Sequence, residues 1–323
     1  MRQTIIGGAD NSLNSGVTEY NNICGGQQWH ATEALKAQIV STAGTFSYLW
    51  VELDGTPDFG ASWIFTLMKN GVAQSLAVTL SDDDLQVFND ISSFTVAAGD
   101  TISLRATSSG GPTNRKARWA CRFKGDAAED SILLGSVGKP TKTSSRYHLI
   151  QGVDVSSTSE NYAIQIIPTA GKLKNLYVKM RLAPGSGSEA YSYTLRVNNV
   201  SKALTCTITG AATTGNDTTN EVDVVAGDRV ALIITPLNSP TNSTDAFLGM
   251  TFQPTAKGES IIMGGSITGP STEKYAPLQH NVYTYVDEAS EALIYQEILS
   301  GYLKNLYVWT TDLPGSASWD ITI

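Results

Sequence analysis

The sequence repeats itself at an interval of about 128 residues, and this repeat restricts the possible folds more than any other feature. The segment GKLKNLYV at 171–178 returns almost unchanged as GYLKNLYV at 301–308, and GTFSYLWV at 44–51 is a more distant copy. The segment AGDTISL at 98–104 is matched by AGDRVAL at 226–232. Segments that recur in one order at a nearly constant offset indicate tandem structural modules.

The starts of the modules match as well. TII at 4–6, SIL at 131–133 and SII at 260–262 are each closely followed by glycine. We therefore predict one module over 1–126, a second over 127–256 and the first half of a third over 257–323. Half a sandwich would leave an open edge and an uncovered apolar face, so we expect the chain to continue or another chain to supply the missing strands.

Within a module the pattern is that of β-strands. Apolar and polar residues alternate, as in TLRV at 194–197, and turn signals follow one another closely. Asn70-Gly71 and Asn198-Asn199 tolerate the positive φ of a hairpin turn. The segment 31–37 has some helical character, but its counterpart at 159–167 resembles a strand, so we predict a strand in both.

About eight strands in a module of this length predict an all-β fold of tandem jelly-roll-like β-sandwich modules. A jelly roll is favoured over an immunoglobulin-like sandwich because immunoglobulin domains are shorter, at about 100 residues, and because the Cys…Trp…Cys spacing is absent.

Composition and charge exclude several classes of partner. Charged residues make up 16% of the chain and the net charge is −8, so no basic patch can release the counterions of nucleic acid or of an anionic membrane. No apolar run reaches 18 residues, so we predict no membrane insertion. The first residues lack the apolar core of a signal peptide, so if Met1 is the true start we expect the protein to be made and released in the cytoplasm.

No residue is predicted to be catalytic, to bind a cofactor or to bind a metal. The histidines stand at unrelated positions of the repeat without a carboxylate or thiol at ligand spacing; they are His30, His148 and His280. The aspartates at 82–84 could hold Ca²⁺, but the counterpart at 210–215 is neutral, which favours a solvated loop. We therefore predict a protein that is not an enzyme.

Two further groups of residues have structural interpretations. Asp100 and Asp228 recur after glycine at the start of a strand, where an aspartate caps its own turn. The three cysteines are far apart, odd in number and without a CxxC pair, so we interpret Cys24, Cys121 and Cys206 as small apolar residues in strands.

Aromatic residues gather in one strand of successive modules; they are Tyr48, Trp50, Tyr177, Tyr307 and Trp309. By alternation Tyr48 and Trp50 share one face of their strand, as do Tyr307 and Trp309. Such a strip could stack on sugars, but core or interface packing is the favoured interpretation.

The motifs AGDx(I/V)xL and GxLxNLYV resemble the jelly-roll modules of the C1q/TNF-like kind, which occur in phage fibres, virion decoration proteins and bacterial surface filaments. The resemblance covers both whole modules and the half module. It implies trimerisation or lateral assembly, and it carries over no catalytic residue.

Three functions agree with this sequence. The first is a non-enzymatic structural protein of an extracellular assembly, such as a phage virion fibre or a capsid-decorating protein, which assembles in the host cytoplasm. The second is a secreted bacterial surface filament or adhesin subunit, which requires an export signal. The third is a set of carbohydrate-binding modules. We expect self-association as a trimer or polymer and contacts with other structural subunits, with cell-surface glycan as an alternative partner.

Overall fold

The protein is described by a computed structural model that covers residues 2–265 except 10, 27, 128 and 154–155. Beyond 265 it describes 273, 275–276, 278–279, 299, 301–310, 318 and 320–323. Strands dominate this part of the chain, and its only helical elements are two short 3-10 turns, so the predicted all-β class is confirmed. No helix in it is long and apolar enough to cross a bilayer.

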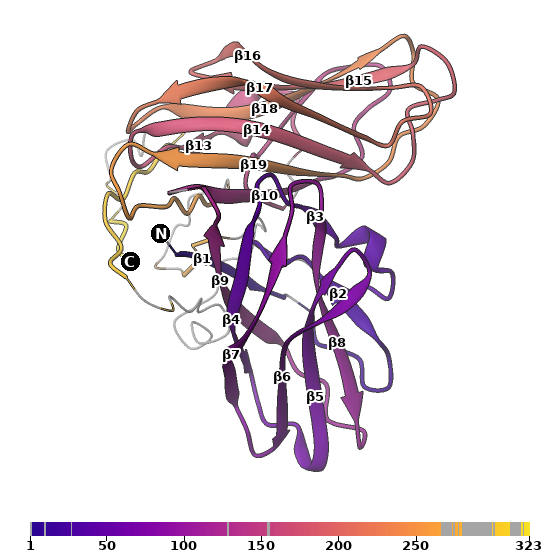
Figure 1. Cartoon of the computed structure of the whole chain (residues 1–323), viewed down its shortest axis with the longest axis vertical. Helices are drawn as coiled ribbons and strands as arrows, with labels where there is room; N and C mark the ends of the chain where they lie inside the picture. Colours follow the sequence, from indigo (N-terminus) through magenta and orange to yellow (C-terminus); the bar gives the residue numbers. More distant parts are fainter. Residues whose placement is uncertain are drawn as a thin grey trace.

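The first sandwich consists of two sheets that enclose one apolar core (Figure 1). One sheet has the order β1-β9-β4-β7, and the other has the order β2-β8-β5-β6 with β3 beside β8. Its strands are β1 (Gln3–Gly8), β2 (Glu19–Asn21), β3 (Gln38–Ile39), β4 (Gly44–Leu53), β5 (Asp58–Lys69), β6 (Val72–Asp82), β7 (Gln86–Val96), β8 (Thr101–Ser109) and β9 (Ala117–Gly125).

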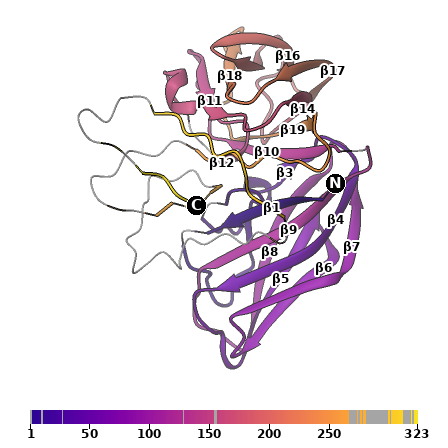
Figure 2. The same cartoon turned by 90° about the vertical axis from the view of Figure 1, so that its left-hand side faces the viewer.

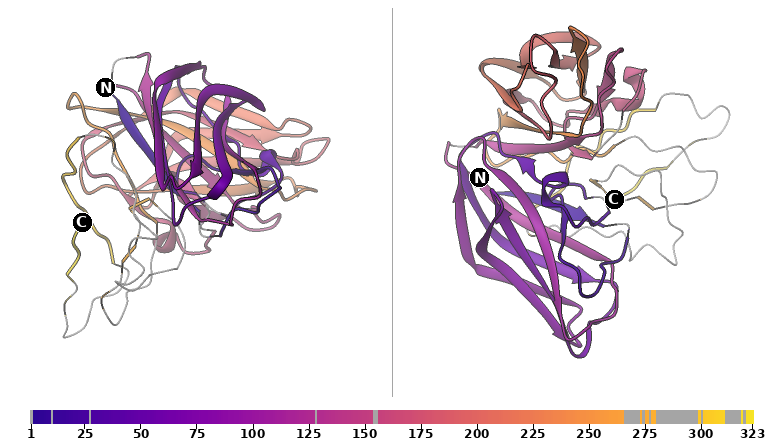
Figure 3. Two further views of the ribbon diagram at one scale, coloured as in Figure 1. Left: turned by 90° about the horizontal axis from the view of Figure 1, so that it is seen from below. Right: turned by 90° about the vertical axis from the view of Figure 1, so that its right-hand side faces the viewer.

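The second sandwich has the same arrangement. Its sheets have the orders β12-β10-β19-β14-β17 and β11-β18-β15-β16, with β13 beside β18. Its strands are β10 (Ser131–Val137), β11 (Arg146–His148), β12 (Gly152–Val153), β13 (Gln165–Ile166), β14 (Gly171–Met180), β15 (Ala190–Val197), β16 (Val200–Thr209), β17 (Thr214–Val224), β18 (Arg229–Leu237) and β19 (Ala246–Pro254). This sandwich lies across the end of the first, with its strands running crosswise (Figures 1, 2 and 3).

Each sandwich is built from one long antiparallel ribbon folded over on itself, and in the second the short strand β12 adds a parallel pair with β10. The β5–β6 hairpin is the tip of the first ribbon, closed by Asn70 (φ 51°) and Gly71 (φ 78°), as the turn signal predicted. From the tip, β4 pairs with β7, β2 and β3 pair with β8, and β1 pairs with β9. In the first sandwich every strand pair thus joins an early strand (β1–β5) to a late strand (β6–β9). This is the strand order of a jelly roll.

The pairing register places the two first strands one residue away from the sequence alignment. Ile5 lies opposite Cys121, and Leu133 lies opposite Met250, so Ile5 corresponds to Leu133 rather than to Ile132. A slip of one residue exchanges the two faces of a strand, and the correction therefore decides which side chains point into which core.

The predicted strands at 31–37 and 159–167 are wrong in part. Each contains a 3-10 turn, Glu33–Leu35 and Glu160–Ala163, and only the short strands β3 and β13 follow. The turns are held by side chains from the neighbouring sheet, because Ser103 donates a hydrogen bond to Glu33 at 2.8 Å and Arg196 pairs with Glu160 at 2.8 Å.

Most of the predicted third module, 257–323, lies outside the described residues, and its described residues form no strand. One local feature of the repeat is nevertheless visible there. A residue of positive φ stands at the same position in the three corresponding segments 44–51, 171–178 and 301–308: Tyr48, Asn175 and Asn305, at 56°, 53° and 58°. In the two sandwiches this residue marks a β-bulge.

Candidate functional site: the joint between the sandwiches

The contact between the two sandwiches, called the joint here, begins with a strand that serves two cores. Ile132 and Leu134 on β10 are 1% exposed and pack in the core cluster of the first sandwich. Leu133, between them, points the other way and packs in the core of the second sandwich. The second sandwich therefore completes the core of the first with its own first strand.

The same arrangement returns where the second sandwich meets the next segment. Ile261 and Met263 are 1% and 3% exposed and pack in the core cluster of the second sandwich. They follow Ile132 and Leu134 by 129 residues, in the corresponding segment of the repeat. Two successive joints thus use the same two positions.

Hydrogen bonds fix the register of the inserted segments. The Gln3 side chain bonds to the backbone of Ile132 in both directions, through its Nε2 to the carbonyl at 2.7 Å and through its Oε1 from the N–H at 2.8 Å. At the second joint the N–H of Met263 donates to Oε1 of Gln151 at 2.9 Å, and Gln165 Nε2 donates to the Met263 carbonyl at 3.1 Å. These side-chain amides pair backbone groups that burial would otherwise leave unsatisfied.

An ion pair also recurs. Asp130 is 4% exposed and lies 3.1 Å from Nζ of Lys174. The corresponding residues of the next unit, Glu259 and Lys304, form the same pair. Hydrogen bonds from Lys304 and from Thr169 hold the pKa of Glu259 below its usual range.

A tyrosine of each following unit rests on a glycine turn of the preceding one. A Cβ added to Gly99 would lie 3.9 Å from Cε1 of Tyr177, and a Cβ added to Gly227 would lie 3.9 Å from Cε1 of Tyr307. Both glycines have a φ near 90°, which side chains rarely adopt. The tyrosines therefore meet a surface that only glycine forms without strain.

Asp100 and Asp228 build these turns, as predicted. Oδ2 of Asp100 accepts from the N–H of Ala97 at 2.8 Å, and Oδ1 accepts from Asn70 Nδ2 at 2.6 Å. Asp228 makes the same two bonds, to Val225 and Asn198. Each aspartate thus ties the glycine turn to the hairpin tip of the ribbon.

The face of the second sandwich at the joint is adapted to close approach. A Cβ on Gly249 would lie 2.2 Å from the carbonyl oxygen of Ile39, so only glycine fits there. Beside it, the hydroxyls of Ser41 and Thr251 lie 2.9 Å apart in a buried position. Where the second sandwich has Gly249 opposite Tyr177, the first sandwich has Ala120 opposite Trp50. The methyl group of Ala120 prevents a backbone carbonyl from approaching the first sandwich as closely as the Ile39 carbonyl approaches Gly249.

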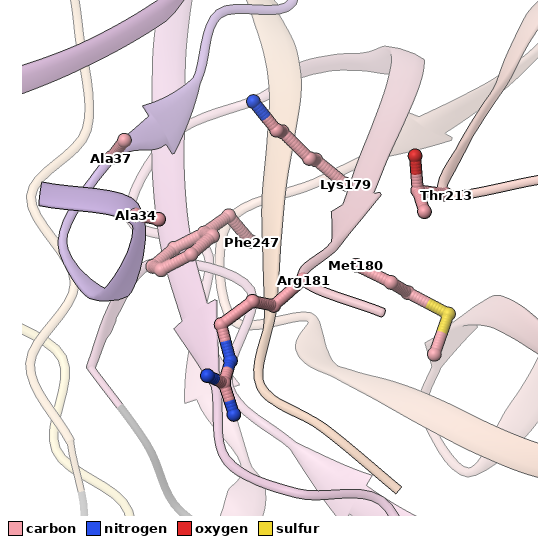
Figure 4. A pocket seen from close by; sticks show the side chains of 7 residues that line it. All are labelled: Ala34, Ala37, Lys179, Met180, Arg181, Thr213 and Phe247. Carbon is pink, nitrogen blue, oxygen red and sulfur yellow. The ribbon is translucent and has the colours of Figure 1, made fainter. Parts of the chain in front are cut away.

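A small cavity of about 140 Å³ lies at the rim of the joint (Figure 4). The first sandwich contributes Ala34 and Ala37 and the second contributes Lys179, Arg181 and Phe247, among others. Nearby, burial lowers the pKa of Lys36 to about 8, although the carboxylate of Asp245 acts in the opposite direction. The cavity is too small for a substrate of ordinary size, since ligand pockets measure about 300–1,000 Å³.

The other residues considered from the sequence form no common site. His30 accepts a hydrogen bond from the N–H of Thr32, His148 is buried in β11, and His280 lies outside the described residues. At 82–84, Asp82 accepts from the N–H of Gly60 and Asp84 from that of Ser81. Among the described residues, no group of three acidic, His or Cys side chains could hold a metal ion.

The cysteines are free and buried. Burial raises the pKa of Cys24 and of Cys206 to about 12 and raises that of Cys121 as well. Cys121 and Cys206 lie in strands, whereas Cys24 lies in a bend, contrary to the prediction. Its thiol faces the backbone of Leu134 and is thus part of the joint.

The aromatic residues divide between two environments. Tyr177 and Tyr307 belong to the joints, and Trp309 lies 4.6 Å from the guanidinium carbon of Arg229. Trp50 is 9% exposed on the outer face of its sheet. It packs there with Ile6, Ala120, Ile262, Leu278 and Leu299.

The residues that form the joint were not among those predicted from the sequence. A signal was present, because Ile132, Leu133 and Leu134 are three apolar residues in succession. A strand with one solvent-exposed face would alternate apolar and polar residues. Three apolar residues in a row on a short strand indicate burial on both faces.

No protein-family model matches the chain, so none supports the resemblance to C1q/TNF-like modules, and no curated protein matches it. Among solved structures the chain is similar to a Paenibacillus xanthan lyase, at 12% sequence identity and a TM-score of 0.21. The match covers 78% of this chain and 25% of that one, so the chain spans about a quarter of the length of the lyase. A similarity of this size carries no argument about function.

Proposed function

We propose that this chain is a non-enzymatic structural protein in which jelly-roll modules are joined into a rigid array. The observation that carries the proposal is the repetition of the joint. Two apolar side chains and one tyrosine–glycine contact cross both joints in corresponding positions, and an ion pair within the following unit recurs beside each joint. A repeated, buried joint gives every module the same orientation to the preceding one, which is what a fibre or coat requires.

The assembly we propose is a phage virion fibre or a capsid decoration. The sparse charge of the chain and the burial of its histidine in β11 and of its three thiols agree with a structural role. The partners in this proposal are further copies of the chain, as a trimer or polymer, and other structural subunits. A secreted bacterial filament subunit would use the same joint.

Solution scattering of the full chain tests rigidity. We expect the curve to fit one fixed arrangement of the two sandwiches. The variant Ile132→Ser with Leu134→Ser places two hydroxyls in the first core, and we expect it to broaden the distribution of distances between the sandwiches. The matched variant Val200→Ser changes an exposed residue, 57% accessible, and should leave the curve unchanged. A wild-type curve that requires freely moving sandwiches would contradict the proposal.

Electron microscopy with gold-labelled antibodies against the chain tests its location. Labels at regular intervals along fibres, or over virion heads, are expected. Labels on the cell surface would favour the secreted filament. Binding to a glycan array by a protein that labels no particle would instead favour carbohydrate-binding modules.

A further inference from the structure

Strand β7 is the free edge of the sheet β1-β9-β4-β7. Its later half is partly capped by the other sheet, because Lys69 Nζ donates to the carbonyl of Thr95 at 3.1 Å and Ser75 Oγ donates to that of Ser93 at 3.3 Å. In the part of the chain that the structure describes, no side chain caps the backbone of 86–88 in this way. The earlier half of β7 therefore offers backbone groups to a further strand.

A bulge in this half pushes one side chain outward. Oδ1 of Asn89 accepts from the N–H groups of Ile91 and Ser92, at 3.1 and 2.9 Å, and Ile91 is 93% exposed. The second sandwich builds the same bulge with Asp217, whose Oδ1 accepts from Thr219 at 3.1 Å. Because threonine stands at the corresponding position of the second sandwich, the bulge does not require an isoleucine at 91.

An exposed aromatic side chain precedes Ile91 by three residues on the same strand. Phe88 is 56% exposed, and its ring lies nearly parallel to that of Tyr48, with a centroid distance of 5.7 Å and an angle of 4°. The Arg122 guanidinium covers Tyr48 at 4.3 Å. The stack holds Phe88 in one position, so little side-chain entropy is lost when a partner covers it. The corresponding residue of the second sandwich, Asn216, is polar.

The two corresponding edges also differ in charge. Over Gln86–Val96 the only charged residue is Asp90, whereas Thr214–Val224 contains Asp217, Glu221 and Asp223. Two copies of the acidic edge would bring three carboxylates from each strand together, whereas two copies of β7 bring together only Asp90 of each strand. Charged side chains are a common protection of edge strands, and β7 has almost none.

From these differences we propose that the β7 edge is a contact between two copies of this chain, with Phe88 and Ile91 as its anchors. The edge strands pair antiparallel, which makes the contact isologous, with each copy contributing the same residues. The proposal deepens the structural function proposed above and rests on it, because the joint extends the array along the chain and this edge connects neighbouring arrays laterally.

Sedimentation velocity of the full chain, from a few micromolar to several hundred micromolar, tests the proposal. We expect wild type to show a dimer or larger species at high concentration. The variant Phe88→Asn with Ile91→Thr installs the residues of the second sandwich, and we expect its dissociation constant to rise at least tenfold. The matched control Val200→Thr removes an equally exposed apolar residue elsewhere and should associate like wild type.

A second variant, Ile91→Lys, adds a charge at the edge without touching the core and should abolish association. A wild type that stays monomeric throughout, or variants that associate as tightly as wild type, would overturn the proposal. The scattering test of the joint is independent of this result. Rigid monomers would refute the lateral contact alone, whereas flexible chains that still associate through β7 would refute the rigid array.

Discussion

The variant Leu134→Ala tests whether a residue of the second sandwich stabilises the first sandwich rather than its own. Leu134 belongs to β10 of the second sandwich but packs in the core cluster of the first. Its neighbour Leu133 lies on the same strand and packs in the second core. The variants Leu134→Ala and Leu133→Ala therefore remove the same atoms from two different cores.

The expected magnitude follows from burial. Leu134 is 1% exposed and Leu133 is fully buried. Replacement of a buried leucine by alanine costs about 3–5 kcal/mol, which includes the cavity left behind. With a dependence on urea of about 2 kcal/mol per molar, the unfolding midpoint of the affected sandwich falls by roughly 1.5–2.5 M.

Tryptophan fluorescence distinguishes the two sandwiches in a background that carries Trp309→Phe and Trp319→Phe, because the second sandwich contains no tryptophan and Trp309, which lies against its Arg229, is then removed. Trp63 and Trp119 are buried in the first core and report its unfolding. We expect Leu134→Ala to lower the midpoint measured by fluorescence by the full amount. Leu133→Ala should lower it by less than half as much, while it shifts the circular dichroism transition of the second sandwich.

Equal shifts of the fluorescence midpoint in the two variants would refute this reasoning, and so would a shift that is larger in Leu133→Ala. Either result would mean that the first core does not depend on the insertion of β10.

Three further predictions concern the Asp100 turn, the dependence of stability on pH and the reactivity of the thiols. Asp100→Ala removes two hydrogen bonds of the glycine turn and should lower the free energy of unfolding of the first sandwich by about 1–2 kcal/mol in the same urea assay. A decrease of less than about 0.3 kcal/mol would mean that these bonds do not stabilise the sandwich. Hydrogen bonds from the side chain and backbone of Thr113 lower the pKa of Asp58, so its contribution to stability is present above the ordinary carboxyl pKa and is lost as pH falls through the folded value. Asp58→Asn should therefore lower the urea midpoint at pH 7 and have no effect at the lowest pH, and a difference that persists in acid would contradict this. Burial keeps the three thiols protonated, so a chromogenic disulfide reagent at pH 8 should label Cys24, Cys121 and Cys206 only in urea; rapid labelling of the native protein would show that they are accessible.

Much of the fold could be predicted from local patterns. Alternation indicated the strands, and Asn70-Gly71 marked the tip of the ribbon because few residue pairs tolerate that turn. The roles of Asp100 and Asp228 were also predictable, since an aspartate after glycine at a strand start has few other uses. These features depend on residues that are close in sequence.

The joint depends on residues that are far apart, and this is why the sequence did not predict it. Nothing near Gly249 indicates that the Ile39 carbonyl approaches it. The choice of register was decisive as well, because a shift of one residue assigns Leu134 to the wrong core. The 3-10 turns were missed for a related reason, since the partner of Glu160 is Arg196 on β15, 36 residues further along the chain.

The folded ribbon has a consequence for synthesis on the ribosome. Among the strands that the structure describes, β1 pairs with β9, so Gln3 cannot pair before Phe123 has been made. At 5–20 residues per second this delay is about 6–24 s, during which β1 has no partner strand. The hairpin tip can close first, and pairing then proceeds from it towards both ends of the ribbon. Because β10 follows β9 directly, Ile132 and Leu134 can complete the first core before the rest of their own sandwich has been made. The core of each module would thus be completed by the first strand of the module that follows it.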